Sequence, residues 1–272
     1  WNYPISMITR KLGPALAAGC TVVLKPAEAT PLTAVETFKI FEDAGFPPGV
    51  VNLVTAGDPK PVGEEFTSNP KVAKLTFTGS TAVGKLLAGK AAGNMKRVSC
   101  ELGGHAPFLV LKDADPVHAA KGLQLVKFLN TGQACISPNR IFVHRDVLDG
   151  FLDTLSGRVG GMKAGNGMEQ GVTIGPLVNE AAVAKVENQV NDAVAKGAEV
   201  LCGGTRLTDG DLGQGHFFAP TVLTDVTPEM LIYREETFGP VAAVVPFDDD
   251  DDVLAMANDT HYGLAAYVYS QN

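Results

Sequence analysis

The sequence predicts an α/β protein in which two parallel sheets, each packed against helices, follow one another along the chain. Short, β-branched apolar runs alternate with segments whose apolar residues recur every three or four positions, a pattern typical of strands connected by helices. The strands are continuously apolar, as expected where helices cover both faces of a sheet. A second series of this kind starts after residue 101. We therefore place a domain boundary at Gly103-Gly104, giving domains 1–103 and 104–272.

The first series has the order strand, helix, strand, helix, strand, helix. Its first helix shows the spacing most clearly, with Val35, Phe38 and Phe41 on one face and the breaker Pro47-Pro48-Gly49 beyond its end. Ligands of such sheets bind at the carboxyl ends of strands, so residues that directly follow a strand are site candidates. The predicted strands are 21–25, 50–54 and 72–77, and the predicted helices are 33–43, 62–67 and 80–92.

The second series contains the amphipathic segment 180–196, for which we expect a structural role. Its apolar stripe consists of Val183, Val186, Val190 and Val194. The acidic run 248–252 indicates either a helix start, which the helix dipole favours, or a cation site. The predicted strands are 108–111, 141–144, 199–202, 217–223, 241–247 and 264–269, and the other helices are 116–129 and 147–155.

Composition excludes several classes of function. The chain has 272 residues and a net charge of −8, and no basic stripe is present to bind a nucleic acid. No apolar run reaches the roughly 18 residues of a membrane-spanning helix, and no signal-peptide pattern occurs. The widely spaced cysteines favour a reducing, cytoplasmic compartment without disulfides or structural metal. They are Cys20, Cys100, Cys135 and Cys202.

The ends of the chain indicate a fragment. It opens at Trp1 without an initiator methionine, and it closes on the strand-like run 264–269 with no completed turn after it.

Cys135 is the candidate nucleophile. It lies between a helix-like and a strand-like apolar run, in a stretch crowded with Asn, Thr, Gly, Gln, Ser and Pro, which is poor material for a core and typical of an exposed loop. The alternative for a lone cysteine is a small buried apolar residue. Glu101, 34 residues upstream and followed by Gly103-Gly104, is the candidate base.

The turn 78–85 connects a strand to a helix, where backbone N–H groups attract phosphate. It also matches the first seven residues of the nucleoside-triphosphate P-loop, so a phosphoryl-transfer enzyme is the competing hypothesis. Leu86 contradicts it, because that position should offer a hydroxyl to magnesium. The dinucleotide fingerprint G-x-G-x-x-G is absent, and a helix start without a ligand is equally compatible with this turn.

Two further motifs are weak when taken alone. Lys25 and Glu28 lie at the carboxyl end of the first strand, where they would hold a ribose or simply lie on the surface. Glu236 and Phe238 belong to an acidic, aromatic Gly-Pro turn.

Six motifs in order carry a resemblance to a known family. They are Trp1-Asn2-Tyr3-Pro4, Lys25-Pro26-Ala27-Glu28, the Gly79 turn, Glu101-Leu102-Gly103-Gly104, Gly132-Gln133-Ala134-Cys135 and Glu236-Thr237-Phe238-Gly239-Pro240. Together they resemble the aldehyde dehydrogenase superfamily over the whole chain. The resemblance implies a Rossmann-like NAD-binding domain and a catalytic domain, here without the family's N-terminal part and C-terminal end. It also implies a homo-oligomer, a dimer or tetramer, at full length.

By this resemblance Cys135 attacks an aldehyde, Asn2 and the Cys135 N–H hold the oxyanion, and Glu101 activates the water that hydrolyses the thioester. Because Glu28 would accept a ribose hydroxyl and repel a 2′-phosphate, we expect NAD rather than NADP. The implied cofactor residues are Trp1, Lys25, Glu28, Gly79, Ser80, Leu102, Glu236 and Phe238.

Segments 1–11 and 257–267 are most similar to the succinate-semialdehyde dehydrogenase branch. That similarity implies that Arg10 binds the substrate carboxylate, a task that suits a guanidinium fork; a surface position on a helix is the alternative. Two positions depart from the branch. Leu129 replaces a common arginine, and Ser137 replaces a frequent second cysteine, so no disulfide switch is expected at this loop.

We expect succinate semialdehyde as the substrate, with another aliphatic or hydroxy-aldehyde as the alternative. A CoA-acylating enzyme would lack the base, so Glu101 disfavours it. A binding protein without activity remains an alternative from another class.

Overall fold

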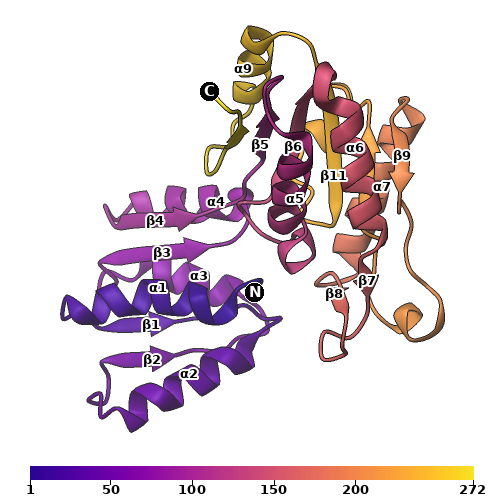
Figure 1. The fold of residues 1–272 in the computed structure, drawn as a ribbon. Coiled ribbons are helices and arrows are strands. Elements are labelled where there is room, and N and C mark those ends of the chain that lie inside the picture. Colours follow the sequence, from indigo (N-terminus) through magenta and orange to yellow (C-terminus); the bar gives the residue numbers. More distant parts are fainter. The chain divides into compact units, whose positions relative to one another are not determined.

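The computed structural model describes all 272 residues, and the chain divides into two compact units, Trp1–Leu102 and Gly103–Asn272 (Figure 1). The predicted domain boundary lies one residue further along the chain, after residue 103. The two units are described separately below.

The first unit alternates helices and strands, as the sequence predicts. Its strands form two parallel pairs, β1 with β2 and β3 with β4. Helix α1 lies in a segment for which the sequence analysis predicts no element, and Pro14 lies within it. The elements are α1 (Pro4–Ala17), β1 (Val22–Leu24), α2 (Pro31–Asp43), β2 (Val51–Leu53), α3 (Lys60–Ser68), β3 (Lys74–Thr78), α4 (Thr81–Ala92) and β4 (Arg97–Glu101) (Figure 1).

The core of this unit covers one face of the β1–β2 pair. Ile8 and Leu12 of α1 and Ala34 of α2 are buried and pack against the apolar residues of both strands. Val23 points to the opposite face, since successive strand residues alternate, and it is 50% exposed. The prediction of one sheet with helices on both faces is therefore wrong for this pair.

The second unit is built on a six-stranded sheet with the order β12-β5-β6-β11-β10-β9. All neighbouring strands are parallel except β9, which is antiparallel to β10. The six strands of this sheet are β5 (Ala106–Val110), β6 (Pro138–His144), β9 (Glu199–Cys202), β10 (Thr221–Thr224), β11 (Val241–Phe247) and β12 (Tyr267–Tyr269). Two short strands, β7 (Lys163–Ala164) and β8 (Val172–Ile174), form a separate parallel pair. The helices are α5 (Pro116–Lys127), α6 (Arg145–Gly160), α7 (Glu180–Ala195), α8 (Leu231–Arg234) and α9 (Asp250–Asn258).

Helices cover both faces of this sheet, which explains its continuous apolar strands. One core cluster joins α5 and α6 to residues such as Phe108 and Ile141, and the other joins α7 and α9 to their strand neighbours Leu109 and Phe142. Every residue of β6 is buried.

The apolar stripe of α7 differs from the prediction at one position. Ala193 is fully buried, whereas Val194 is 46% exposed. The buried residues Val183, Val186, Val190 and Ala193 recur every three or four positions, as the helical period requires.

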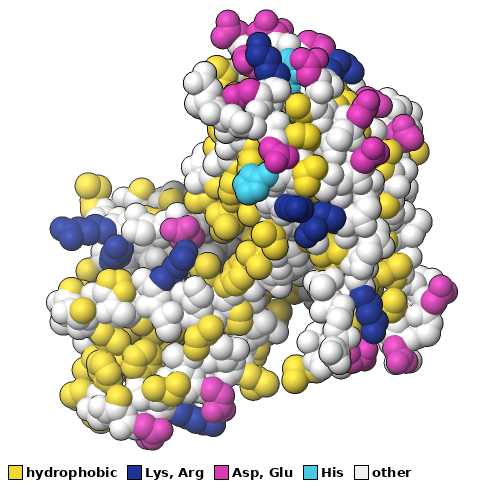
Figure 2. Space-filling view, in the orientation of Figure 1, with side chains coloured by type: hydrophobic (Ala, Val, Ile, Leu, Met, Phe, Trp, Pro, Cys, Tyr) yellow, Lys and Arg dark blue, Asp and Glu magenta, His cyan; other side chains and the backbone are white.

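The acidic run 248–252 starts a helix, as the dipole argument predicts. The Asp249 carboxylate accepts hydrogen bonds from the backbone N–H groups of Asp251 and Asp252, which caps α9. Figure 2 shows acidic side chains gathered at the end of the second unit where α9 lies. None of the helices in either unit combines the length and apolar character that crossing a bilayer requires.

Candidate active site

Cys135 lies on the connection between α5 and β6, and its side chain is partly exposed. The prediction of an exposed loop holds for Cys135 and for the exposed residues Asn130 and Ile136, and it fails for four polar neighbours that are buried. Those buried neighbours are Thr131, Gln133, Ser137 and Asn139. They are tolerated inside the unit because each forms hydrogen bonds, as buried polar groups must.

The first half of this loop is tied to segment 175–178, which follows β8. Thr131 Oγ1 accepts from Gly175 N at 3.0 Å and lies 3.2 Å from the Gly175 carbonyl. Gln133 accepts from Val178 N at 2.9 Å through Oε1 and donates to Pro176 O at 3.2 Å through Nε2. The loop is therefore held by a segment about 40 residues further along the chain.

The backbone before Cys135 is in the left-handed region at three consecutive positions. Asn130, Thr131 and Gly132 have φ of 50°, 61° and 74°. This costs about 1–2 kcal/mol at a β-branched residue such as Thr131, and the buried hydrogen bonds offset the cost. At Gly132 a Cβ would lie 2.1 Å from the carbonyl oxygen of Gly239, so only glycine fits.

Glu236 is connected to the Cys135 loop through Gly104. Its Oε1 accepts a hydrogen bond from Gly104 N at 2.9 Å. Gly104 in turn packs so closely on the loop that a Cβ there would lie 2.0 Å from Cys135 O. Burial raises the pKa of Glu236, while the Gly104 N–H and the charges of Lys185 and Lys127 lower it. The structure thus brings Cys135, Gly104 and Glu236 together, and Phe238 lies two residues further along.

Lys127 is a residue of this site that the sequence analysis misses. It is fully buried, and its Nζ donates to Asn139 Oδ1 at 2.8 Å and to Ser137 Oγ at 3.2 Å. Burial lowers the pKa of Lys127 to about 7, and the Glu236 carboxylate raises it. One signal in the sequence is that Lys127 lies four positions after Leu123, on the buried face of α5.

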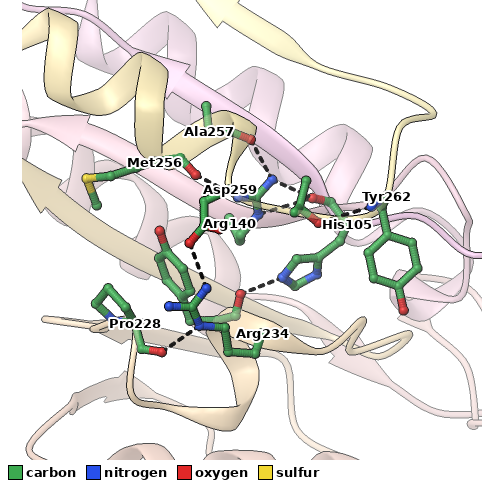
Figure 3. Close-up of polar contacts among 10 residues, drawn as sticks. His105, Arg140, Pro228, Arg234, Met256, Ala257, Asp259 and Tyr262 are labelled. Carbon is green, nitrogen blue, oxygen red and sulfur yellow. Dashed lines mark hydrogen bonds and ion pairs between the residues drawn. The ribbon is translucent and has the colours of Figure 1, made fainter.

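A group of polar side chains next to Gly104 was also not predicted (Figure 3). The buried guanidinium of Arg140 donates to the backbone carbonyls of His105, Met256 and Ala257 at 2.9–3.2 Å, which ties the start of β5 to the end of α9. His105 Nε2 lies 2.7 Å from Tyr233 O, and burial lowers the pKa of His105 to about 4. A hollow of about 410 Å³ adjoins this group. It is lined by His105, Tyr233, Arg234, Asn258, Asp259, Thr260 and His261.

In the first unit, Lys25 and Glu28 lie beside a hollow of about 280 Å³ at the carboxyl ends of β1 and β2. Its lining consists of Pro26, Ala27, Glu28, Pro31, Thr55, Ala56 and Gly57. Lys25 Nζ forms an ion pair with Glu28 Oε1 at 2.5 Å. Trp1 lies close enough to Lys25 and Glu28 for the charges of both residues to act on its backbone nitrogen.

The turn after β3 has the geometry of a capped helix rather than a P-loop. Ser80 caps α4 by accepting from Val83 N at 3.3 Å. Gly84 and Lys85 lie inside the helix, and a Cβ on Gly84 would lie 2.4 Å from Leu102 Cδ2. A P-loop places its Gly-Lys pair at the helix start, so the phosphoryl-transfer hypothesis is wrong on this geometry.

Glu101 is the last residue of β4 and lies opposite Thr78 of β3. Gly79 N donates to Glu101 O at 3.1 Å. Lys11 Nζ donates to Thr78 Oγ1 at 2.6 Å, and the Glu101 charge raises the pKa of Lys11 against the larger effect of desolvation. The Glu101 carboxylate and the Lys11 ammonium therefore lie near each other in this unit.

The remaining candidates also belong to the first unit. Asn2 is partly exposed just before α1, and Arg10 is exposed within α1 and forms no ion pair. Trp1, Asn2, Arg10, Lys25, Glu28, Gly79, Ser80, Glu101 and Leu102 thus lie in the first unit, and Cys135, Glu236 and Phe238 lie in the second.

The sequence matches known proteins over its whole length. The model of the aldehyde dehydrogenase family matches residues 1–272. The chain is 52% identical to a probable succinate-semialdehyde dehydrogenase of Sinorhizobium fredii, named as NADP(+)-dependent, and 51% identical to a glutarate-semialdehyde dehydrogenase of Pseudomonas aeruginosa. Each match covers 100% of this chain and 55% of the relative.

A solved structure shows the same fold. The crystal structure of succinate-semialdehyde dehydrogenase from Burkholderia pseudomallei matches with a TM-score of 0.96 at 52% identity, covering 100% of this chain and 55% of that chain. The chain therefore spans about half the length of the curated relatives it matches. With the family model matched from end to end, the chain belongs to the aldehyde dehydrogenase family.

Proposed function

We propose that the protein oxidises an aldehyde to a carboxylic acid through a thioester on Cys135, with a nicotinamide dinucleotide as the oxidant. The observation that carries this proposal is the arrangement in the second unit, where a partly exposed thiol lies on a loop packed against Gly104, whose N–H binds Glu236. The family match and the dehydrogenase names of the two relatives support it.

In the proposed reaction the Cys135 sulfur adds to the aldehyde carbon and forms a thiohemiacetal. The Asn2 amide and the Cys135 backbone N–H hold the resulting oxyanion; removing one such donor lowers a rate by about 10²–10³. Loss of a hydride from that carbon gives the thioester. Glu101 then takes a proton from water, the hydroxide adds to the thioester carbon, and the acid leaves as the Cys135 sulfur is released.

The residues of the first unit fit a dinucleotide. The hollow beside Glu28 lies at the carboxyl ends of two parallel strands, where such sheets bind ligands. Ser80 engages one N–H of the first turn of α4, and the other N–H groups of that turn are suited to a pyrophosphate. We assign the adenosine ribose to Lys25 and Glu28, the pyrophosphate to Trp1, Gly79 and Ser80, and the nicotinamide end to Leu102, Glu236 and Phe238. When bound, the nicotinamide supplies the hydride acceptor.

The choice between NAD and NADP is a separate proposal. Glu28 predicts NAD, but the name of the Sinorhizobium relative specifies NADP(+), so the comparison does not support that preference. In this chain the Glu28 carboxylate is also engaged by Lys25, which reduces its repulsion of a 2′-phosphate. We therefore propose that both nucleotides are accepted, and the ratio of their KM values in the parent and in Glu28→Gln tests this.

For the substrate we propose an aldehyde with a distal carboxylate, succinate semialdehyde first. The two relatives named above act on semialdehydes of this chemistry. Arg10 is the proposed carboxylate ligand, and its exposed guanidinium is not committed to any ion pair of the fold. Leu129, 47% exposed at the start of the Cys135 loop, keeps a neutral aliphatic aldehyde as the second candidate. We further propose a cytoplasmic homo-oligomer.

The test is an assay of the complete protein with NAD or NADP and a panel of aldehydes, in which reduced nucleotide is followed by absorbance. We expect the parent and the control variant Cys20→Ala to oxidise succinate semialdehyde, and Cys135→Ala to lose the activity while still binding nucleotide. Oxidation by Cys135→Ala at the parent rate would show that another group is the nucleophile.

A further inference from the structure

The base of the Cys135 loop is closed by one buried ammonium group. Lys127 is the last residue of α5, and its partners Ser137 and Asn139 lie ten and twelve positions later, after Cys135. The side chains of all three residues are at most 1% exposed. The two hydrogen bonds of Lys127 Nζ therefore join the residue before the loop to the residues at its far end, away from water.

The hydrogen bonds continue from this ammonium to Glu236. Asn139 accepts from Lys127 and donates through Nδ2 to Gly104 O at 3.4 Å. The same Gly104 donates its N–H to Glu236 Oε1. Its close approach to Cys135 O means that the loop cannot shift toward Gly104 without a clash. Lys127 is thus connected, through Asn139 and Gly104, to the Glu236 carboxylate and to the backbone of Cys135.

Charged side chains from several elements act on Lys127 and Glu236. Glu236 is the opposite charge that raises the pKa of Lys127. Lys127 in turn acts on Glu236 and, together with Arg140 and His261, on His105, while Lys185 acts on Glu236. An apolar side chain would fill such a buried place without the desolvation cost of an ammonium, and is often as stable. Stability alone therefore does not account for a lysine here.

We propose that Lys127 is a positioning residue, which holds the Cys135 loop and the Glu236 carboxylate in one fixed arrangement through Ser137, Asn139 and Gly104. This inference rests on the proposed function for its consequences in catalysis. It also predicts that the reactivity of the Cys135 thiol depends on the buried Lys127, and this reactivity can be measured without any enzymatic assay.

The experiment compares four variants of the complete protein. Lys127→Met removes the ammonium and keeps the length of the side chain. Lys127→Met/Asn139→Leu replaces the buried polar pair with an apolar pair and tests the proposal if the single variant does not fold. Ser137→Ala removes one hydroxyl, which accepts from Lys127 Nζ and donates to Lys127 O at 3.5 Å, and leaves the Lys127–Asn139 hydrogen bond in place. Lys121→Met is the matched control, because Lys121 is an exposed lysine of the same helix.

Two readouts are used. The first is the rate at which iodoacetamide alkylates Cys135, measured by peptide mass spectrometry with the exposed Cys20 of the first unit as internal reference. The second is kcat and the nucleotide KM, measured separately. A loss of folded protein would lower the apparent kcat and leave the nucleotide KM unchanged.

We expect Lys127→Met and the double variant to change the alkylation rate of Cys135 about fivefold or more, because the loop that carries the thiol loses the hydrogen bonds that join its two ends. Ser137→Ala changes it in the same direction by less. We expect kcat to fall about tenfold or more as the loop loses its geometry, and the nucleotide KM to rise with the loss of the Glu236 position. Lys121→Met and the Cys20 reference keep the parent values.

A folded Lys127→Met or double variant that keeps the alkylation rate of Cys135, the nucleotide KM and kcat within about twofold of the parent would overturn the proposal. Failure of the proposed function has a different signature: the parent itself would oxidise no aldehyde, while alkylation of Cys135 would still depend on Lys127.

Discussion

His105 directly follows Gly104, and its side chain is 2% exposed. Burial lowers the pKa of His105 from 6.5 to about 4, so the ring is neutral in the folded protein at pH 7. Between pH 6.5 and about 4 the unfolded chain binds a proton that the folded protein does not, and the free energy of unfolding falls as the pH falls. The loss attributable to this one group reaches about 3 kcal/mol.

We therefore expect His105→Gln to reduce the acid sensitivity of the second unit. Urea midpoints at pH 7 and pH 5 should differ less in His105→Gln than in the parent, and His118→Gln, which changes an exposed histidine, should behave like the parent. An equal pH dependence in His105→Gln and the parent would contradict the assignment.

Arg10 tests the substrate at the scale of one residue. If its guanidinium binds a distal carboxylate, Arg10→Leu should lower kcat/KM for succinate semialdehyde about tenfold or more, because a charge-assisted hydrogen bond of about 1.5–3 kcal/mol is lost. Butanal, which has the same length and no carboxylate, should be oxidised equally by both proteins. Equal losses for both aldehydes would instead assign Arg10 a structural role.

Individual residues were predicted unevenly from the sequence, for a physical reason. Cys135 and Glu101 are candidates because they lie in turns of distinctive composition, whereas Glu236, whose turn is weak evidence alone, becomes a candidate only through the family resemblance. Lys127 and Arg140 were missed because long charged side chains are rarely fully buried, and their burial depends on partners elsewhere in the chain. Their partners are backbone, amide or hydroxyl oxygens, groups that every sequence offers at many positions.

At the scale of elements, most predicted helices and strands are present because their apolar periods are strong. The strand predicted at 217–223 is shorter, Thr221–Thr224, since residues 217–220 precede the part of the chain that pairs with β11. The sequence predicts too much exposure for the polar residues of the Cys135 loop, because such a composition is typical of residues in contact with water. The fold instead buries these residues against segment 175–178, a contact that no local pattern predicts.

The junction between the loop and β5 gives a test at this scale. Gly104→Ala would place a Cβ 2.0 Å from Cys135 O, so backbone must move, and we expect a destabilisation of about 1–3 kcal/mol with loss of most aldehyde oxidation. Gly157→Ala is the matched control. No atom lies within 4 Å of its added Cβ in the exposed face of α6, and alanine should stabilise that helix by about 0.5–1 kcal/mol. Urea unfolding of both variants measures the difference, and a stable, fully active Gly104→Ala would refute the close approach.

For the whole molecule, the alternation of strands and helices in the sequence predicts the α/β fold class. The structure divides the chain directly before the Gly103-Gly104 motif. Sequence patterns could not show that Glu236 binds a backbone group 132 residues away, because this contact depends on the strand order β5-β6-β11 in the sheet. The proposed reaction draws residues from both units: Cys135 and Glu236 from the second, Asn2 and Glu101 from the first.

The most direct measurement is the mass of the peptide that carries Cys135 after the complete Glu101→Gln protein has been mixed with succinate semialdehyde and NAD or NADP. Without the base, hydrolysis of the thioester slows, and we expect an acyl group to accumulate on Cys135 together with one equivalent of reduced nucleotide. Cys135→Ala should show neither product. Steady turnover by Glu101→Gln at the parent rate, with an unmodified Cys135 peptide throughout, would contradict the covalent mechanism.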